Sequence, residues 1–337
     1  MNTPASIDSD GLELRAWSVG DAPVLQAFQS EGAREPRFRP RTQVEFDWAC
    51  GQNPAGARLV LARRGGQIVA YAFGLAVRTR VLGETRTFTH MLAAGLEPLG
   101  GVGQVGEGDE RAWLSAARAF HAEYLRPEVD LLHYGWPGAR TRELGRVHLE
   151  HERLRAQSLL MRDTGSGASA ASPLVRALVR FGPEADLLYA SCATHWNASA
   201  IRDAAFLNWR FAEHPRHRYR LLGVQSGQTL RGYAVLRRCD ELGPRQELLL
   251  DWLVLPGDEE AAENLLAAAL AGARANGAGV LVAAFPEWSP WSLWFQERGF
   301  LHHSSERVEV VRAAAPRFDM LWLRDNWWTT LGDAQDL

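Results

Sequence analysis

The feature that most constrains the fold of this 337-residue chain is an internal duplication. Three residues of the first half recur in the second half at a common offset of 161: Trp48, Pro54 and Gln67 correspond to Trp209, Pro215 and Gln228. Further along, Trp136-Pro137 resembles Phe285-Pro286 at an offset of 149, so the first copy carries a longer loop. A repeated unit of about 160 residues predicts two similar domains.

The stretch DTGSGASAAS at residues 163–172 is small and polar, and it separates the two copies. Such a composition is typical of a flexible linker. We therefore expect a first domain at 11–163, a linker at 164–173 and a second domain at 174–337. In each copy the hydrophobic patterns predict a strand, two helices, three antiparallel strands, a helix, a strand, a helix and a closing strand. RVEVVR (307–312) and DMLWLR (319–324) are expected as the last two strands.

This order of elements predicts the α+β class, with a mixed, mostly antiparallel sheet and helices on both faces in each domain. A net charge of −3 argues against nucleic acid or an anionic membrane as partner. No apolar stretch approaches the roughly 20 residues of a membrane helix. Three scattered cysteines suit reduced thiols, so we expect a cytoplasmic protein. The sequence leaves the oligomeric state open.

The succession of elements resembles the fold of the GNAT acyl-CoA-dependent N-acyltransferases. NWRFAEHP (208–215) and WWTTLGDAQD (327–336) are similar to motifs of a bacterial group of tandem GNAT proteins found beside exopolysaccharide genes. The resemblance covers Leu12 to Asp336. That group usually places two closing aspartates two residues apart, whereas Asp333 and Asp336 are three apart here.

The resemblance implies where an acyl-CoA would bind. In GNAT enzymes the fourth strand parts from the fifth and exposes backbone groups to the pantetheine arm, which here implies Leu92, Ala93 and Ala94. A turn and a helix N-terminus then hold the pyrophosphate. The first copy lacks the usual arginine, but its loop offers the candidates Gly100, Gly101, Gly103 and Gln104. These form either a variant phosphate loop or a surface loop without a ligand.

The second copy departs further from the phosphate-binding pattern. Asp258, Glu259 and Glu260 stand where the pyrophosphate should lie. Carboxylates at a helix start stabilise the helix, whereas close to a phosphate they would repel it. We therefore expect the second domain not to bind coenzyme A.

The chemistry of N-acyl transfer needs a base for the amine and often an acid for the departing thiolate. His90 and Asp251 correspond at the offset of 161, on the strand that would line the cleft, so each is a candidate base. Structural roles, in packing for His90 and in a buried hydrogen bond for Asp251, remain open. Many relatives use a tyrosine as the acid; neither expected helix has one, and Tyr134 on the preceding strand is the nearest substitute.

We therefore expect an N-acyltransferase that takes acetyl-CoA, or another acyl-CoA, as co-substrate and needs no metal. Its acceptor would be a small-molecule amine, such as an amino sugar or another metabolite. The alternative is an inactive GNAT-fold pseudoenzyme that binds a ligand or partner. Aminoacyl transfer from tRNA is disfavoured because the chain lacks a basic surface for RNA.

Overall fold

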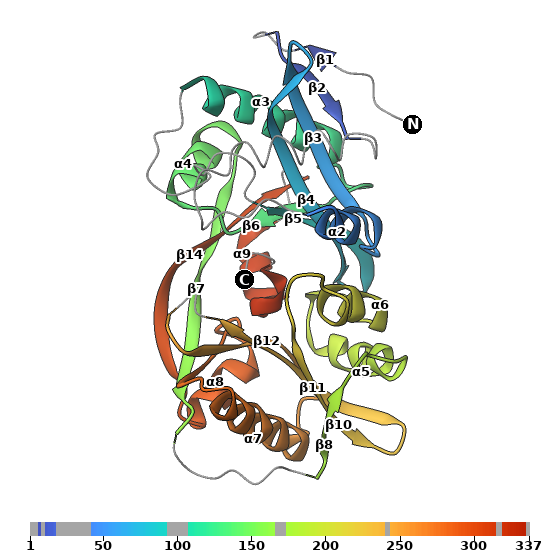
Figure 1. Cartoon of the computed structure of the whole chain (residues 1–337), viewed down its shortest axis with the longest axis vertical. Coiled ribbons are helices and arrows are strands. Elements are labelled where there is room, and N and C mark those ends of the chain that lie inside the picture. Colours follow the sequence, from blue (N-terminus) through green and yellow to red (C-terminus); the bar gives the residue numbers. More distant parts are fainter. Residues whose placement is uncertain are drawn as a thin grey trace. The chain divides into compact units, whose positions relative to one another are not determined.

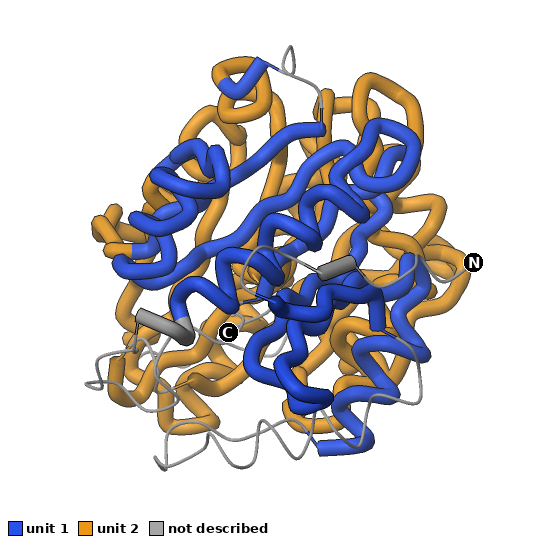
Figure 2. The backbone as a smooth tube through the Cα atoms, turned by 90° about the horizontal axis from the view of Figure 1, so that it is seen from above, with its two compact units in different colours: residues 1–78, 86–155, 307–320 blue, residues 79–85, 156–306, 321–337 orange. Residues whose placement is uncertain are grey.

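The computed structural model describes residues 6–7, 11–17, 42–92, 107–165, 173–239, 243–314 and 319–334. The chain forms two compact units, coloured blue and orange in Figure 2. Unit 1 comprises residues 1–78, 86–155 and 307–320, and unit 2 comprises residues 79–85, 156–306 and 321–337. The labels of helices and strands are those of Figure 1.

The internal duplication is visible in two short helices that have the same local structure. In unit 1, α2 (Gln43–Phe46) runs directly into a π-helical turn at Asp47–Gly51. In unit 2, α6 (Ala204–Leu207) runs into a π-helical turn at Asn208–Ala212, at the same offset of 161. Since π turns are rare, this shared irregularity supports a common ancestor. The side chains of Thr42 and Asp203 cap the two helices.

The described strands of unit 1 form a mixed, mostly antiparallel sheet. Its order is β1 (Ser6–Ile7), β2 (Glu13–Ala16), β3 (Ala57–Arg64), β4 (Gln67–Val81), β5 (Glu84–Leu92), β6 (Leu132–Gly135), the end of β14 (Leu301–Ala313) and the start of β7 (Glu152–Asp163). Strands β5 and β6 are parallel, with Phe88 opposite Leu132 and His90 opposite Tyr134. The crossover between these two strands contains α3 (Glu107–Tyr124), and α4 (Ala139–His148) follows β6.

The core of unit 1 lies between α3 and the first strands of the sheet. Ala112, Ala116 and Phe120 of α3 are buried against Val60 and Ala72 of β3 and β4. The apolar residues of α3 recur at helical spacing, so one face of the helix covers the sheet. This packing fixes α3 beside the crossover from β5 to β6.

The sheet of unit 2 repeats this plan. Its order is the start of β14, the end of β7, β13 (Val280–Ala283), β12 (Gln246–Val254), β11 (Thr229–Cys239), β10 (Arg220–Ser226) and β8 (Val175–Leu178). Strands β12 and β13 are parallel, and so are the short strands β9 (Ala198–Ala200) and β15 (Trp327–Trp328). Strand β9 pairs with β15 and with residues 79–81 of β4, which belong to this unit.

Helices cover both faces of the sheet of unit 2, as the predicted class requires (Figure 1). On one face, α7 (Glu259–Ala275) and α8 (Pro290–Glu297) bury Trp252 together with Trp291 and Trp294. On the other face, α5 (Glu184–Cys192) contacts β11 and β12. The predicted α+β class with a mixed sheet is confirmed.

Two details of the sequence prediction were wrong. Residues 319–324 were expected as a strand, but they begin the helix α9 (Met320–Asn326), in which Leu323 is buried. A run of four apolar residues cannot separate helix from strand by its periodicity. In addition, the two hairpins align at an offset of 162. Gln67 opens β4 opposite Arg64, whereas Gln228 lies within the turn between Ser226 and Thr229.

The predicted helix at residues 21–32 lies outside the described residues. The compact units and the predicted domains divide the chain differently at three places. The tip of the β4–β5 hairpin (79–85) belongs to unit 2, and β7 and β14 each contribute one part to unit 1 and the other to unit 2.

Candidate functional site

The parallel pair β5–β6 brings two predicted site residues together in unit 1. His90 and Tyr134 are paired across the two strands, and their rings stack with centroids 5.1 Å apart and an interplanar angle of 20°. Trp136 packs edge-on against both rings, at 5.3 Å from His90 and 5.8 Å from Tyr134. His90 and Tyr134 are fully buried. The chain thus places an imidazole and a phenol in contact on the parallel strands β5 and β6.

The expected cofactor-binding residues fall at the edge of the described residues or beyond it. Leu92 is buried and ends β5, whereas Ala93, Ala94, Gly100, Gly101, Gly103 and Gln104 lie outside the described residues. At the last described positions the two strands are still close. A Cβ atom on Gly135 would lie 2.8 Å from the carbonyl oxygen of Met91. A glycine is therefore required here because the backbones approach each other.

The opposite face of the same strand pair carries a buried chain of histidines that sequence reasoning missed. Arg58 donates two hydrogen bonds to Asp130, at 3.1 and 2.9 Å, and Thr89 donates a third at 2.8 Å. His133 lies 3.3 Å from Asp130 through Nε2. The Nδ1 atoms of His133 and His121 are 2.9 Å apart, and the Nε2 atoms of His121 and His151 are 3.0 Å apart. Polar residues inside apolar strands and helices were the available signal.

The carboxylate at one end sets the tautomers of all three rings. Because Asp130 accepts, His133 carries its proton on Nε2 and accepts at Nδ1. His121 must then donate from Nδ1 and accept at Nε2, so His151 donates from Nε2. Burial would raise the pKa of Asp130, but hydrogen bonds from His133 and Arg58 outweigh it and hold that pKa low. Each of the three rings is therefore neutral, and each donates one hydrogen bond in the direction of the Asp130 carboxylate.

Burial keeps these histidines uncharged. It lowers the pKa of His121 well below its usual value, and the neighbouring His133, His151 and Arg312 add to the effect. Burial also lowers the pKa of His133, against the opposing effect of Asp130. For His151, burial followed by Arg312 and His133 lowers the pKa to about 3. A proton added to this chain would have no water to stabilise it.

Acidification is expected to destabilise unit 1. Unfolded histidines bind a proton below pH ~6.5, whereas folded His151 stays neutral down to about pH 3. The contribution of neutral His151 to the free energy of unfolding is thus complete above pH ~6.5 and is lost as the pH falls toward 3. By linkage His151 alone should cost roughly 2 kcal/mol at pH 5. Urea unfolding of the full chain at pH 7 and pH 5 measures the loss.

His151→Phe supplies the control for this pH dependence, because it removes one titrating ring and keeps an aromatic side chain. Its stability should fall less steeply than that of the wild type between pH 7 and 5. His214 and His217 of unit 2, with pKa values lowered to about 2 and about 4 mainly by burial, contribute a slope of the same sign that both proteins share. Equal slopes in the two proteins would contradict the neutral chain.

Asp251 lies in unit 2, where it holds a buried cation. Arg202 donates from Nε to both oxygens of Asp251, at 3.0 and 3.2 Å, and from Nη2 to Asp333 at 2.7 Å. Tyr233 and Thr330 each donate a hydroxyl proton to Asp251, at 2.9 Å. The guanidinium also lies 4.5 Å from the ring centre of Trp328. Every group of this network is at least nine-tenths buried.

The C-terminal segment is bound directly over the bulge of β12. Between the pairs Leu236–Leu249 and Val235–Asp251 the register shifts, so Leu250 is an extra residue. The pairing of β12 with β13 ends at Leu248, while β12 continues to Val254. At the bulge, a Cβ atom on Gly332 would lie 2.8 Å from the Leu250 carbonyl oxygen. Residues of this chain therefore cover the bulge.

The three acids at the start of α7 also have partners in unit 2. Asp258 caps the helix and forms a two-point ion pair with Arg231, at 2.9 and 2.6 Å, and Glu260 lies 2.7 Å from the same guanidinium. Glu259 accepts from the indole of Trp294 and from Arg298. These contacts agree with a helix-stabilising role for the acids.

In the described parts of the chain, no group of three or more His, Cys, Asp or Glu side chains is placed to hold a metal ion. None of the helices described has both the length and the hydropathy needed to cross a membrane.

No protein-family model and no curated protein matches the chain. Solved structures do. A GCN5-related N-acetyltransferase from Anabaena variabilis superposes with a TM-score of 0.61 at 12% identity, over 90% of this chain and 73% of that one. A tandem GNAT protein of the clavulanic acid pathway gives 0.56 at 14% identity, over 90% and 99%. N-myristoyltransferase of Saccharomyces cerevisiae with bound myristoyl-CoA gives 0.57 at 11% identity, over 92% and 83%. These likenesses, at 14% identity or less, show that the chain has the GNAT fold.

Proposed function

We propose that this protein is an acyl-CoA-dependent N-acyltransferase whose chemistry takes place in unit 1. The observation that carries the proposal is the stacked pair of His90 and Tyr134 on the parallel strands β5 and β6. In the GNAT fold that strand junction receives the thioester. The similar solved structures include an N-acetyltransferase and an N-myristoyltransferase with bound myristoyl-CoA.

In the proposed reaction the nitrogen of an amine attacks the thioester carbonyl carbon. The C–N bond forms, the C–S bond breaks, and coenzyme A leaves as a thiolate. His90 would accept the proton that the amine loses, and Tyr134 would donate a proton to the thiolate. Burial makes an imidazole a weaker base and a phenol a weaker acid, so the proposal requires the bound substrates to stabilise the charges that the two transfers create.

Unit 2 is the less suitable site for the same reaction. Its counterpart of the cleft holds the ion pair of Arg202 with Asp251, and the segment around Gly332 lies on the bulge. The acids at the start of α7 would repel a pyrophosphate. We infer that unit 2 has a supporting role and that Asp251 organises its core rather than reacting.

The acceptor follows from the fold only as a class. We propose a small-molecule amine, for instance an amino sugar, and acetyl-CoA or a longer acyl-CoA as donor. The first experiment is calorimetric titration of acetyl-CoA into the full chain, joined to hydrogen exchange. Binding should protect residues 84–92 and 132–136 and leave residues 246–254 unchanged.

A second measurement tests catalysis: release of free thiol from acetyl-CoA in the presence of a panel of amines. Thiol release above the hydrolysis rate for at least one amine supports the transferase. Absence of binding at millimolar acetyl-CoA would favour the alternative, a pseudoenzyme. Protection of β12 in place of β5 would move the site to unit 2.

A further inference from the structure

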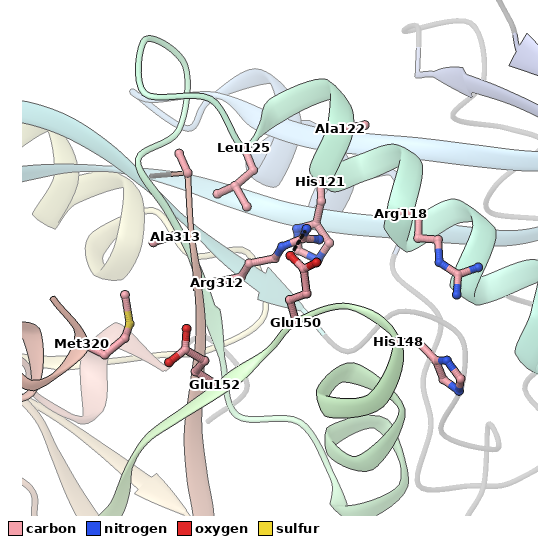
Figure 3. Close-up of a pocket in the computed structure, with 11 residues that line it drawn as sticks. Arg118, His121, Ala122, Leu125, His148, Glu150, Glu152, Arg312, Ala313 and Met320 are labelled. Carbon is pink, nitrogen blue, oxygen red and sulfur yellow. Dashed lines mark hydrogen bonds and ion pairs between the residues drawn. The ribbon is translucent and has the colours of Figure 1, made fainter. Parts of the chain in front are cut away.

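Unit 1 contains a pocket of about 590 Å³ that the proposed acyl transfer does not use. Its polar lining comes from the end of α3, the end of α4, the start of β7 and the end of β14: Arg118, His121, His148, Glu150, Glu152 and Arg312. Its apolar part includes Leu125 and Met320 (Figure 3). The volume falls within the roughly 300–1,000 Å³ that small-molecule sites occupy.

The pocket lies near the candidate pair but on the other face of the sheet. His121 of its lining is 2.9 Å from His133, which directly precedes Tyr134 on β6. Successive side chains of a strand point to opposite faces of a sheet, so His133 and Tyr134 lie on different faces. The pocket also adjoins the beginning of β6, because Ala313 lies opposite Leu132. The sheet therefore separates a ligand in this pocket from an acyl group bound at His90 and Tyr134.

The charges of the lining are balanced and separated in space. Figure 3 shows Arg118 and His148 on one side of the pocket and Glu152 beside Met320 on the other. Arg312 lies between them, 2.8 Å from the carboxylate of Glu150. His121 lines the pocket, but both of its ring nitrogens face other histidines. The groups available to a ligand are thus guanidinium on one side and carboxylate on the other.

Glu150 occupies a position that the backbone alone would give to glycine. It follows the end of α4 with a φ of +54°, in the left-handed region. Glycine or asparagine is usual just after a helix end. A larger residue there stores strain of order 1–3 kcal/mol, and such strain gathers at functional positions. Here the strained residue presents a carboxylate to Arg312 at the pocket wall.

We propose that this pocket binds a small zwitterion, an amino acid or short peptide carrying one carboxylate and one ammonium group. A simple anion would meet Glu150 and Glu152, and a simple cation would meet Arg118 and Arg312. A molecule with both charges satisfies both sides, with its carboxylate toward Arg118 and its ammonium toward Glu152. Leu125 and Met320 would contact its aliphatic part.

The test uses the full chain and the dipeptide L-alanyl-L-alanine as probe, in calorimetric titration with and without saturating acetyl-CoA. The dipeptide should bind equally well in both cases. N-acetyl-Ala-Ala, which lacks the ammonium, and Ala-Ala amide, which lacks the carboxylate, should bind at least about tenfold more weakly, as the loss of an ion pair in a partly enclosed site implies. Inorganic phosphate should not compete.

Arg118→Gln and Glu152→Gln should each weaken the dipeptide by at least about fivefold. The matched controls are Arg140→Gln and Glu143→Gln, exposed residues of α4 outside the pocket lining, and these should leave binding unchanged. Failure of the dipeptide to bind, equal binding of the blocked analogues or of phosphate, or equal effects of the controls would overturn the proposal. The dipeptide titrations can be interpreted whether or not acetyl-CoA binds, so they test the pocket independently of the proposed transferase activity.

Discussion

Replacing His90 by phenylalanine is expected to lower kcat for acyl transfer by about 10²–10⁴-fold, the usual contribution of a general base. Phenylalanine keeps an aromatic ring between Tyr134 and Trp136, so the stack at the strand junction should persist. What it removes is the proton acceptor. Thiol release from acetyl-CoA, with an amine identified as acceptor, measures kcat, and titration of acetyl-CoA should give an unchanged Kd.

His90→Ala and Tyr134→Phe separate chemistry from packing. If His90 only packs, the phenylalanine variant keeps the wild-type rate and the alanine variant loses both stability and activity, which would remove His90 from the mechanism. If His90 is the base, the acidic limb of the pH–rate profile disappears in the phenylalanine variant. Tyr134→Phe should slow transfer less for acyl donors with a more acidic leaving thiol, because these need less help from an acid.

Replacing Asp251 by asparagine is expected to destabilise unit 2 by about 3–5 kcal/mol, since a buried guanidinium then loses a charged partner. Arg202 is fully buried and relies on Asp251 and Asp333; burial would lower its pKa, but these two carboxylates raise it above the usual value. Asp333 alone would leave the buried guanidinium with one carboxylate partner in place of two. Urea unfolding of the full chain, followed for each transition separately, measures the loss.

Glu297→Gln is the matched control for Asp251→Asn. It removes a carboxylate that is 62% exposed and 3.7 Å from Arg298, so unfolding should change little. The triple variant Asp251→Asn, Arg202→Met and Asp333→Asn should recover part of the stability, because it removes all three buried charges of the network. A folded Asp251→Asn protein of nearly normal stability that has lost acyl transfer would instead restore Asp251 as a catalytic candidate.

Much of the fold was predictable because it depends on local patterns that occur twice. Trp48 and Trp209 marked the same helix in both copies, and both lie in π-helical turns. The glycine turns predicted the hairpins, although Gln67 and Gln228, which share the offset of 161, differ by one residue in their place in the two hairpins. The helix α9 was mistaken for a strand, since its short apolar run fits either structure and contacts made elsewhere in the chain decide between them.

The site was predictable only in part. His90 and Tyr134 were singled out separately, and the structure stacks them, but their catalytic roles stay predictions. Asp251 was matched with His90 by sequence offset, yet its environment is set by Arg202, whose partners are 49 and 131 residues away. The only local signal for Asp130, His133, His121 and His151 was the presence of polar residues in apolar segments. That signal could not show that they meet, since they come from α3, from β6 and from the loops before β6 and after α4.

What the sequence determined by itself is the duplication, the order of most elements and the acidic start of α7, because these are properties of neighbouring residues. Only the tertiary structure decided which buried polar groups have partners. Arg58 of β3 and Arg220 of β10 occupy the same strand position in the two units. Arg58 pairs with Asp130, and Arg220 pairs with Glu247. A buried arginine must be neutralised by an acid that the fold brings close to it. The distance in space between the two residues cannot be calculated from their separation along the chain.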